Sequence, residues 1–113
     1  MAKSNKPIVW SLFAAGGTLA AFLAPVLVVL FLFAALGHAP ALLHYSQLHA
    51  FAAHWFGKVF LLTVIALFLW HAAHRLRVTL HDFGLRQDAA VAVVVYVIAA
   101  AGTLATMLFL LRI

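Results

Sequence analysis

The feature that most constrains this chain is the length of its apolar runs, each long enough to cross a bilayer. The first covers about residues 8–36, the second ends near Arg75, and the third covers about residues 89–111. A hydrocarbon core about 30 Å thick is crossed by about 20 helical residues. Because 68% of the 113 residues are hydrophobic and 8% charged, too few polar side chains exist to cover a water-soluble domain. The sequence predicts an all-α integral membrane protein, with three transmembrane helices in a single domain of residues 1–113.

The three crossings differ in how they are expected to fit the membrane. Pro25 lies inside the first run and is expected to bend that helix, because proline removes one backbone hydrogen bond. The second predicted helix, residues 46–82, would be about 55 Å long and must leave the hydrocarbon at both ends. Lys58 and Arg75 lie about 26 Å apart along it, which favours one at each surface. The third helix follows Asp88, a residue that stabilises a helix N-terminus.

The positions of the basic residues predict the orientation. They precede the first helix or flank the connection between the second and third: Lys3, Lys6, Arg75, Arg77 and Arg86. The other connection has no lysine or arginine. The positive-inside rule therefore predicts a cytoplasmic N-terminus and a periplasmic C-terminus. The excess of seven basic over two acidic residues fits anionic lipid headgroups beside apolar runs better than nucleic acid.

Polar side chains gather where the second predicted helix leaves the membrane. At about 100° per residue, an arc of about 120°, called the polar stripe below, contains five of them: His71, His74, Arg75, His81 and Asp82. Arg77 falls outside this arc. At the same predicted depth on the first helix, Trp10, Phe13 and Gly17 share one face.

These two faces together could hold a quinone, which needs flat apolar walls for its ring and donors for its carbonyl oxygens. Imidazole can also supply or accept the protons of quinone chemistry. Aromatic and basic residues also collect at membrane interfaces without any ligand, and the same face could dock a soluble partner. The residues alone leave ligand contact, anchoring and docking open.

Several other kinds of site are not supported by the sequence. There are no cysteines, and the two carboxylates, Asp82 and Asp88, lie at the membrane edge, so we predict no catalytic residue and no metal site. Haem held between two helices needs a histidine on each. The first and third crossings have none, so only a haem shared with another chain, through His71, stays possible.

Two blocks resemble the fumarate reductase D subunit, a small membrane anchor. The first is Pro7 to Gly17, PIVWSLFAAGG, with Ala24-Pro25-Val26 after it. The second helix agrees at four places: Gly57-Lys58-Val59-Phe60, Leu69-Trp70, His74-Arg75 and His81-Asp82. The resemblance covers about the first three quarters of the chain, and the third helix matches only as an apolar span.

The resemblance implies a complex of four subunits in the bacterial inner membrane. A flavoprotein with FAD reduces fumarate, an iron–sulfur protein delivers electrons, and two small anchors, termed C and D, hold both to the lipid bilayer. The anchors carry no haem and help bind menaquinol near the cytoplasmic side, so this chain would be a non-catalytic subunit. By the family's pattern, five residues line or approach the quinone pocket: Trp10, Phe13, Ala14, His74 and Arg75.

One departure from the family's pattern concerns Arg77 and Val78, which stand where that pattern has two histidines. Any quinone contact made by those histidines would fall to Arg77 or to the partner anchor. Two alternatives remain beside this family. One is the small anchor of succinate dehydrogenase, with a b-type haem ligand at His71, and the other is a small membrane scaffold without a redox role.

Overall fold

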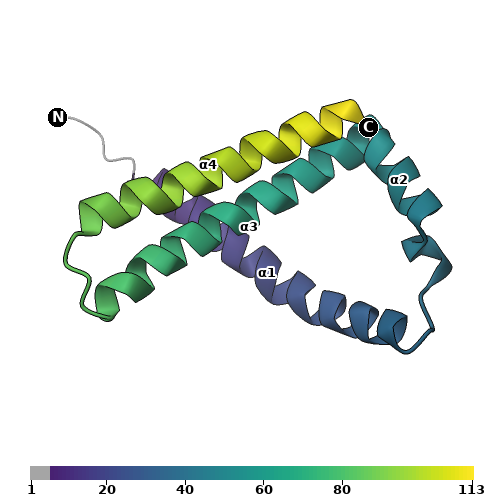
Figure 1. The fold of residues 1–113 in the computed structure, drawn as a ribbon, viewed down its shortest axis with the longest axis horizontal. Helices are drawn as coiled ribbons and strands as arrows, with labels where there is room; N and C mark the ends of the chain where they lie inside the picture. Colours follow the sequence, from purple (N-terminus) through teal and green to yellow (C-terminus); the bar gives the residue numbers. More distant parts are fainter. Residues whose placement is uncertain (1–5) are drawn as a thin grey trace.

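The computed structural model describes residues 6–113, which are helical apart from short connections (Figure 1). The elements, in chain order, are α1 Lys6–Ala35, the 3-10 turn η1 Ala41–Leu43, α2 Tyr45–Ala53, α3 Trp55–Asp82 and α4 Asp88–Arg112. Three of these helices, α1, α3 and α4, are long and apolar enough to cross a membrane. The prediction of an all-α chain with three such spans is therefore confirmed. Lys3, used above for the orientation, lies outside the described residues.

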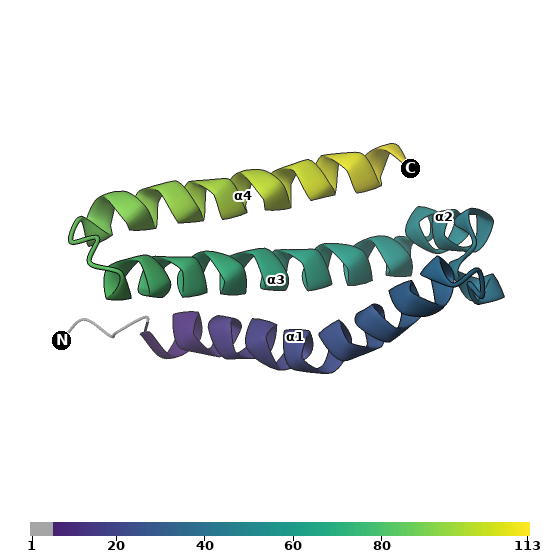
Figure 2. The same cartoon turned by 60° about the horizontal axis from the view of Figure 1, so that its bottom comes forward.

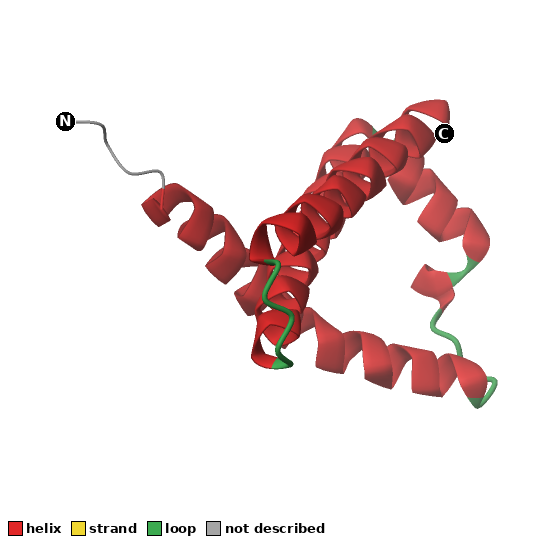
Figure 3. Cartoon of the chain, turned by 60° about the vertical axis from the view of Figure 1, so that its left-hand side comes forward, coloured by secondary structure: helices red, strands yellow, loops and turns green. Residues whose placement is uncertain are grey.

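The long helices are arranged with α3 in the middle, as Figure 2 shows, between α1 and α4. α3 and α4 run antiparallel and lie side by side along most of their lengths. α1 contacts α3 on its other side. The axis of α1, which contains Pro25, bends as predicted (Figure 2). Its C-terminal half diverges from α3, and η1 and α2 bring the chain back (Figure 3).

Small residues set the distance between α3 and α4. The buried core there consists of Ala73, Val95 and Ala99, and Ala99 is only 2% exposed. Further along α4, a Cβ at Gly102 would lie 3.0 Å from Cδ1 of Leu69. Without a hydrophobic effect between helices in lipid, close packing of this kind is what holds the pair together.

The prediction of one continuous helix over residues 46–82 is wrong, because the chain breaks at His54. This residue has an extended backbone, with φ −74° and ψ 142°, and it ends α2 and begins α3. Its Nδ1 accepts a hydrogen bond from the backbone N–H of Phe56 at 3.2 Å, which satisfies one of the free donors at the start of α3.

The break also depends on Gly57, where α2 folds back against the start of α3. A Cβ at Gly57 would overlap the carbonyl oxygen of Phe51, at 1.7 Å. Hydropathy and helical periodicity continue across this point, so they gave no sign of it. After the break, α3 has 28 residues and is about 42 Å long, closer to the thickness of a bilayer with its headgroups.

Lys58 ties this end of α3 to the end of α4. Its Nζ donates to the carbonyl oxygen of Leu110, in the last turn of α4. The same carbonyl oxygen accepts from the backbone N–H of Ile113 at 3.3 Å, and a lysine is a favourable additional donor for the last carbonyls of a helix. The contact fixes the register of α3 and α4 at the end opposite the polar stripe.

Candidate functional site

Two hollows meet at His74, where the start of α1 crosses the second half of α3. The first has a volume of 640 Å³ and is lined by Lys6, Pro7, Val9, Trp10, Phe13 and His74. The second has a volume of 590 Å³ and is lined by Val9, Leu12, Phe13, Ala66, Leu67, Trp70, His74, Arg77 and Tyr96. Both fall within the usual size of small-molecule sites, about 300–1,000 Å³. Their walls are largely apolar, and His74 is the polar residue common to the two.

Glycines on α1 allow its backbone to reach α3 at this level. A Cβ at Gly16 would lie 2.5 Å from the carbonyl oxygen of Leu67 and 2.9 Å from Cβ of His71. A Cβ at Gly17 would lie 2.7 Å from Cε1 of His71. A side chain at Gly16 would push the two helices apart, and one at Gly17 would displace the ring of His71. These glycines therefore allow Phe13 to pack onto α3.

Phe13 packs against both histidines of α3. Its ring stacks on His71, with centroids 4.4 Å apart and an angle of 14° between the planes. It meets His74 edge to face, at 4.6 Å and 61°. Aromatic pairs in these arrangements gain attraction beyond the area that they bury. Phe13 therefore fixes where the two imidazoles lie relative to α1.

His71 joins α3 to α1 through a hydrogen bond. Its Nδ1 lies 3.0 Å from the carbonyl oxygen of Phe13. Because a carbonyl oxygen only accepts, Nδ1 must carry the proton and donate it. With its ring against Phe13 and Gly17, His71 belongs to the contact between the helices.

His74 joins α3 to α4 instead. Its Nδ1 lies 2.9 Å from the hydroxyl oxygen of Tyr96. The ring of Tyr96 also stacks on Trp70, with centroids 5.8 Å apart and 23° between the planes. The half-buried His74 thus lies between an aromatic wall from α1 and a hydroxyl from α4.

Arg77 and Asp88 close this end of the α3–α4 pair with a two-pronged ion pair. Nε of Arg77 donates to Oδ1 of Asp88 at 2.8 Å, and Nη2 donates to Oδ2 at 2.5 Å. Nη1 of Arg77 lies 3.4 Å from the hydroxyl oxygen of Tyr96. The guanidinium also lies 5.8 Å from the centroid of the Tyr96 ring, within the range of a cation–π contact.

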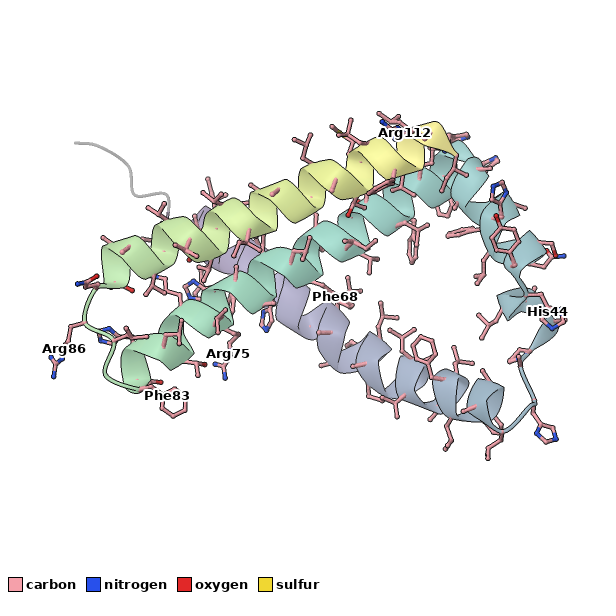
Figure 4. The ribbon with its side chains drawn as sticks, viewed as in Figure 1. His44, Phe68, Arg75, Phe83, Arg86 and Arg112 are labelled. Atoms are coloured by element: carbon pink, nitrogen blue, oxygen red, sulfur yellow. The ribbon has the colours of Figure 1, made fainter. Side chains whose placement is uncertain are left out.

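The structure brings three of the five predicted site residues together. Trp10, Phe13 and His74 all line the first hollow. Ala14 is half-buried on α1, while Arg75 is exposed, and neither lines the two hollows. Figure 4 shows Arg75 pointing away from α4.

The sequence interpretation missed the contribution of α4, and it considered Arg77 only as a possible substitute for the quinone contact of the family's histidines. Tyr96 was the available signal, as a hydroxyl within an otherwise apolar run. Asp88 was noted as a helix start and as a carboxylate at the membrane edge, and not as a partner of Arg77. Of the predicted stripe, His81 and Asp82 are exposed and line neither hollow.

Comparison with known proteins settles the family. The family described as the fumarate reductase D subunit matches residues 1–111. The chain belongs to the fumarate reductase D-subunit family. Among its relatives, the D subunit of Aliivibrio fischeri (strain MJ11) is 34% identical over 98% of this chain and 94% of its own length. The D subunit of Vibrio cholerae serotype O1 (strain M66-2) is 42% identical, over 71% of this chain and 63% of the relative.

A third member of the D-subunit family, from Actinobacillus pleuropneumoniae serotype 5b (strain L20), is 41% identical over 71% of this chain and 68% of the relative. The resemblance in the first two helices is therefore confirmed. As a part of fumarate reductase, the chain works within a complex of several subunits, and its three apolar helices mark it as a multi-pass membrane protein. The family match replaces the two alternative assignments, which were the small anchor of succinate dehydrogenase and a membrane scaffold without a redox role.

Proposed function

We propose that this chain is the small anchor that holds the flavoprotein and iron–sulfur subunits of fumarate reductase at the bacterial inner membrane. Together with the C anchor it helps form the site where menaquinol is oxidised. The observation that most supports a quinol site is the 640 Å³ hollow beside Trp10, Phe13 and His74, in a chain of the D-subunit family. The chain is non-catalytic by itself, since FAD and the iron–sulfur clusters belong to partner subunits.

The residues present fit a quinone head group. Trp10 and Phe13 offer flat apolar surface to a ring, and His74 offers a nitrogen to one of its oxygens. Trp10 is 68% exposed in this chain, so its ring is accessible to a ligand, to a partner subunit or to lipid. Menaquinol bound there would supply electrons to the iron–sulfur protein, while this chain's residues bind and orient its head group.

Ala14 and Arg75 keep a place in the proposed site beside this wall. Ala14 follows Phe13 on α1 and is half-buried. We assign its small side chain the role of letting α1 lie close to α3. Arg75 is exposed next to His74, and we assign it to the polar contacts that quinol or the iron–sulfur protein makes at the membrane edge. A guanidinium suits both, because it offers several donors and keeps its charge.

The proposed orientation places the N-terminus and the turn between α3 and α4 in the cytoplasm, and the C-terminus in the periplasm. Its support is the charge distribution: Arg75 and Arg86 lie at one end of the helices and His44 at the other (Figure 4). Lysine and arginine favour the cytoplasmic side. Lys58 and Arg112 lie at the other end, but these two charges are outweighed by the group around the α3–α4 turn and the start of α1.

Cysteine labelling tests this orientation, because the sequence has no cysteine of its own. Leu42 is 78% exposed beyond α1, and Phe83 is 82% exposed in the α3–α4 turn. We expect a membrane-impermeant maleimide to label Leu42→Cys in intact spheroplasts, and Phe83→Cys only after lysis. Labelling in denaturant checks that both thiols react, and the reverse pattern would show that the orientation is inverted.

Co-purification tests the anchor role. A tag on this chain, in a mild detergent, is expected to retain a flavoprotein, an iron–sulfur protein and a second anchor, each identified by mass spectrometry. A reduced-minus-oxidised spectrum of the same sample is expected to lack a b-type haem band. A complex without the flavoprotein and iron–sulfur partners would refute the anchor role, and a haem band would contradict the haem-free assignment.

A further inference from the structure

The polar groups between α3 and α4 form a chain from Asp88 through Arg77 and Tyr96 to His74. The direction of its first links is fixed by chemistry, because a guanidinium only donates hydrogen bonds and an ionised carboxylate only accepts them. Arg77 gives two N–H groups to the two oxygens of Asp88. A third N–H points at the hydroxyl oxygen of Tyr96, 3.4 Å away.

The hydroxyl of Tyr96 therefore receives a hydrogen bond from Arg77 and has a proton of its own to give. The other polar atom in contact with this oxygen, within residues 6–113, is Nδ1 of His74 at 2.9 Å. Asp88 accepts from Arg77, and the Tyr96 hydroxyl makes no hydrogen bond to it. If His74 donated instead, Tyr96 would receive two donors and its own proton would lack a partner in a largely apolar hollow, which costs free energy.

We propose that Tyr96 is a positioning residue that donates its hydroxyl proton to Nδ1 of His74 and fixes that imidazole with its proton on Nε2. A neutral imidazole has one N–H, so a histidine that accepts through Nδ1 must carry its hydrogen on Nε2. Nε2 of His74 makes no hydrogen bond to residues 6–113. His74 thus offers a single, oriented donor beside Trp10 and Phe13.

His71 shows the opposite arrangement on the same helix. Its Nδ1 donates to the carbonyl oxygen of Phe13 at 3.0 Å, so the proton of its neutral form is on Nδ1. The partner of Nδ1 thus sets the protonated nitrogen in each case, a backbone carbonyl for His71 and a hydroxyl for His74. The two histidines, one helical turn apart, serve the contact between helices and the hollow respectively.

For the quinone site, this inference rests on the proposed function and makes it more specific. With its proton on Nε2, His74 binds an oxygen of the quinone head as a donor, and it is not the base that takes the proton of menaquinol. The two hydrogen-bond partners of Arg77 within residues 6–113 are Asp88 and Tyr96. Its role here is to hold Tyr96 in place.

Nitrogen NMR tests the protonation pattern directly. The assembled complex, with this chain labelled with ¹⁵N-histidine, is studied in bilayers at pH about 8, where free imidazole is neutral. The His74 signals are identified by their loss in His74→Gln. We expect an unprotonated, hydrogen-bonded Nδ1 and a protonated Nε2. In Tyr96→Phe we expect both signals to move as the two neutral forms mix.

The matched control is Tyr45→Phe, which removes the other tyrosine hydroxyl of the chain, on α2, where Tyr45 is 79% exposed. It is expected to leave the His74 signals unchanged. A protonated Nδ1 in the unmodified chain would overturn the inference. So would a Tyr96→Phe spectrum that equals the unmodified one.

Kinetics then test what the fixed proton does. In Tyr96→Phe, we expect the KM for a menaquinol analogue to rise about 3- to 10-fold, the usual worth of one hydrogen bond, with kcat within about twofold. A donor that binds substrate and transition state equally affects KM alone. A fall in kcat at unchanged KM would overturn the donor role. If His74→Phe left quinol turnover intact, the proposed site would fail, while the NMR result would still decide the protonation pattern.

Discussion

Gly16→Ala is expected to separate α1 from α3 at the level of His71 and to remove most quinol-linked turnover. The new Cβ would lie 2.5 Å from the carbonyl oxygen of Leu67 and 2.9 Å from Cβ of His71. Neither atom can rotate away, because one is backbone and the other is attached directly to it. α1 must shift, which breaks the hydrogen bond from His71 to Phe13. We expect a loss of about 1–3 kcal/mol in stability, measured by thermal unfolding of the purified complex, with quinol turnover measured alongside.

Ala15→Val provides the control, because it adds two carbon atoms at the neighbouring position of α1, where the side chain is exposed. Its stability and turnover are expected to stay near those of the unmodified complex. Unchanged behaviour of Gly16→Ala would show that α1 does not approach α3 as closely as the structure has it.

The second large effect is expected at the wall and the donor of the first hollow. Trp10→Ala removes the exposed ring, and His74→Phe keeps an aromatic ring against Phe13 while it removes the nitrogen donor. Each is expected to lower kcat/KM for a menaquinol analogue about tenfold or more, which corresponds to the loss of one aromatic wall or one hydrogen bond in an apolar site. His74→Gln, whose amide still donates, is expected to retain more activity than His74→Phe, as steady-state kinetics would show.

Matched controls for these changes lie at the other end of the chain. Trp55 is 70% exposed at the start of α3, much as Trp10 is 68% exposed on α1, and His49 is exposed on α2. Trp55→Ala and His49→Phe are expected to leave kcat/KM within about twofold. Equal losses in the controls would mean that the effects come from membrane anchoring and not from a pocket.

The sequence predicted the three long helices because a bilayer imposes a minimum length on any apolar helix that crosses it. It did not predict the break at His54. Apolar residues continue through that point, and histidine is not among the preferred N-cap residues. The break depends on Gly57, whose missing side chain leaves room for the carbonyl oxygen of Phe51, and such a contact exists only once the chain has folded.

For the site, periodicity and charge placed Trp10, Phe13 and His74 at one depth, and the structure brings them together around one hollow. The same reasoning favoured Arg75 over Arg77. A helical wheel gives the direction in which a side chain leaves the helix, but it does not give how far a long side chain extends. The long side chain of Arg77 extends to Asp88 on the next helix. That pairing depends on the turn between α3 and α4.

The central claim is that this chain forms part of the menaquinol site of a fumarate reductase. The most direct test is the ratio of quinol-linked to dye-linked fumarate reduction, measured on one complex purified through a tag on this chain. In the complex with Trp10→Ala, we expect dye-linked reduction to be unchanged, since it bypasses the membrane site, and the ratio to fall about tenfold. A ratio equal to that of the unmodified complex would contradict the claim.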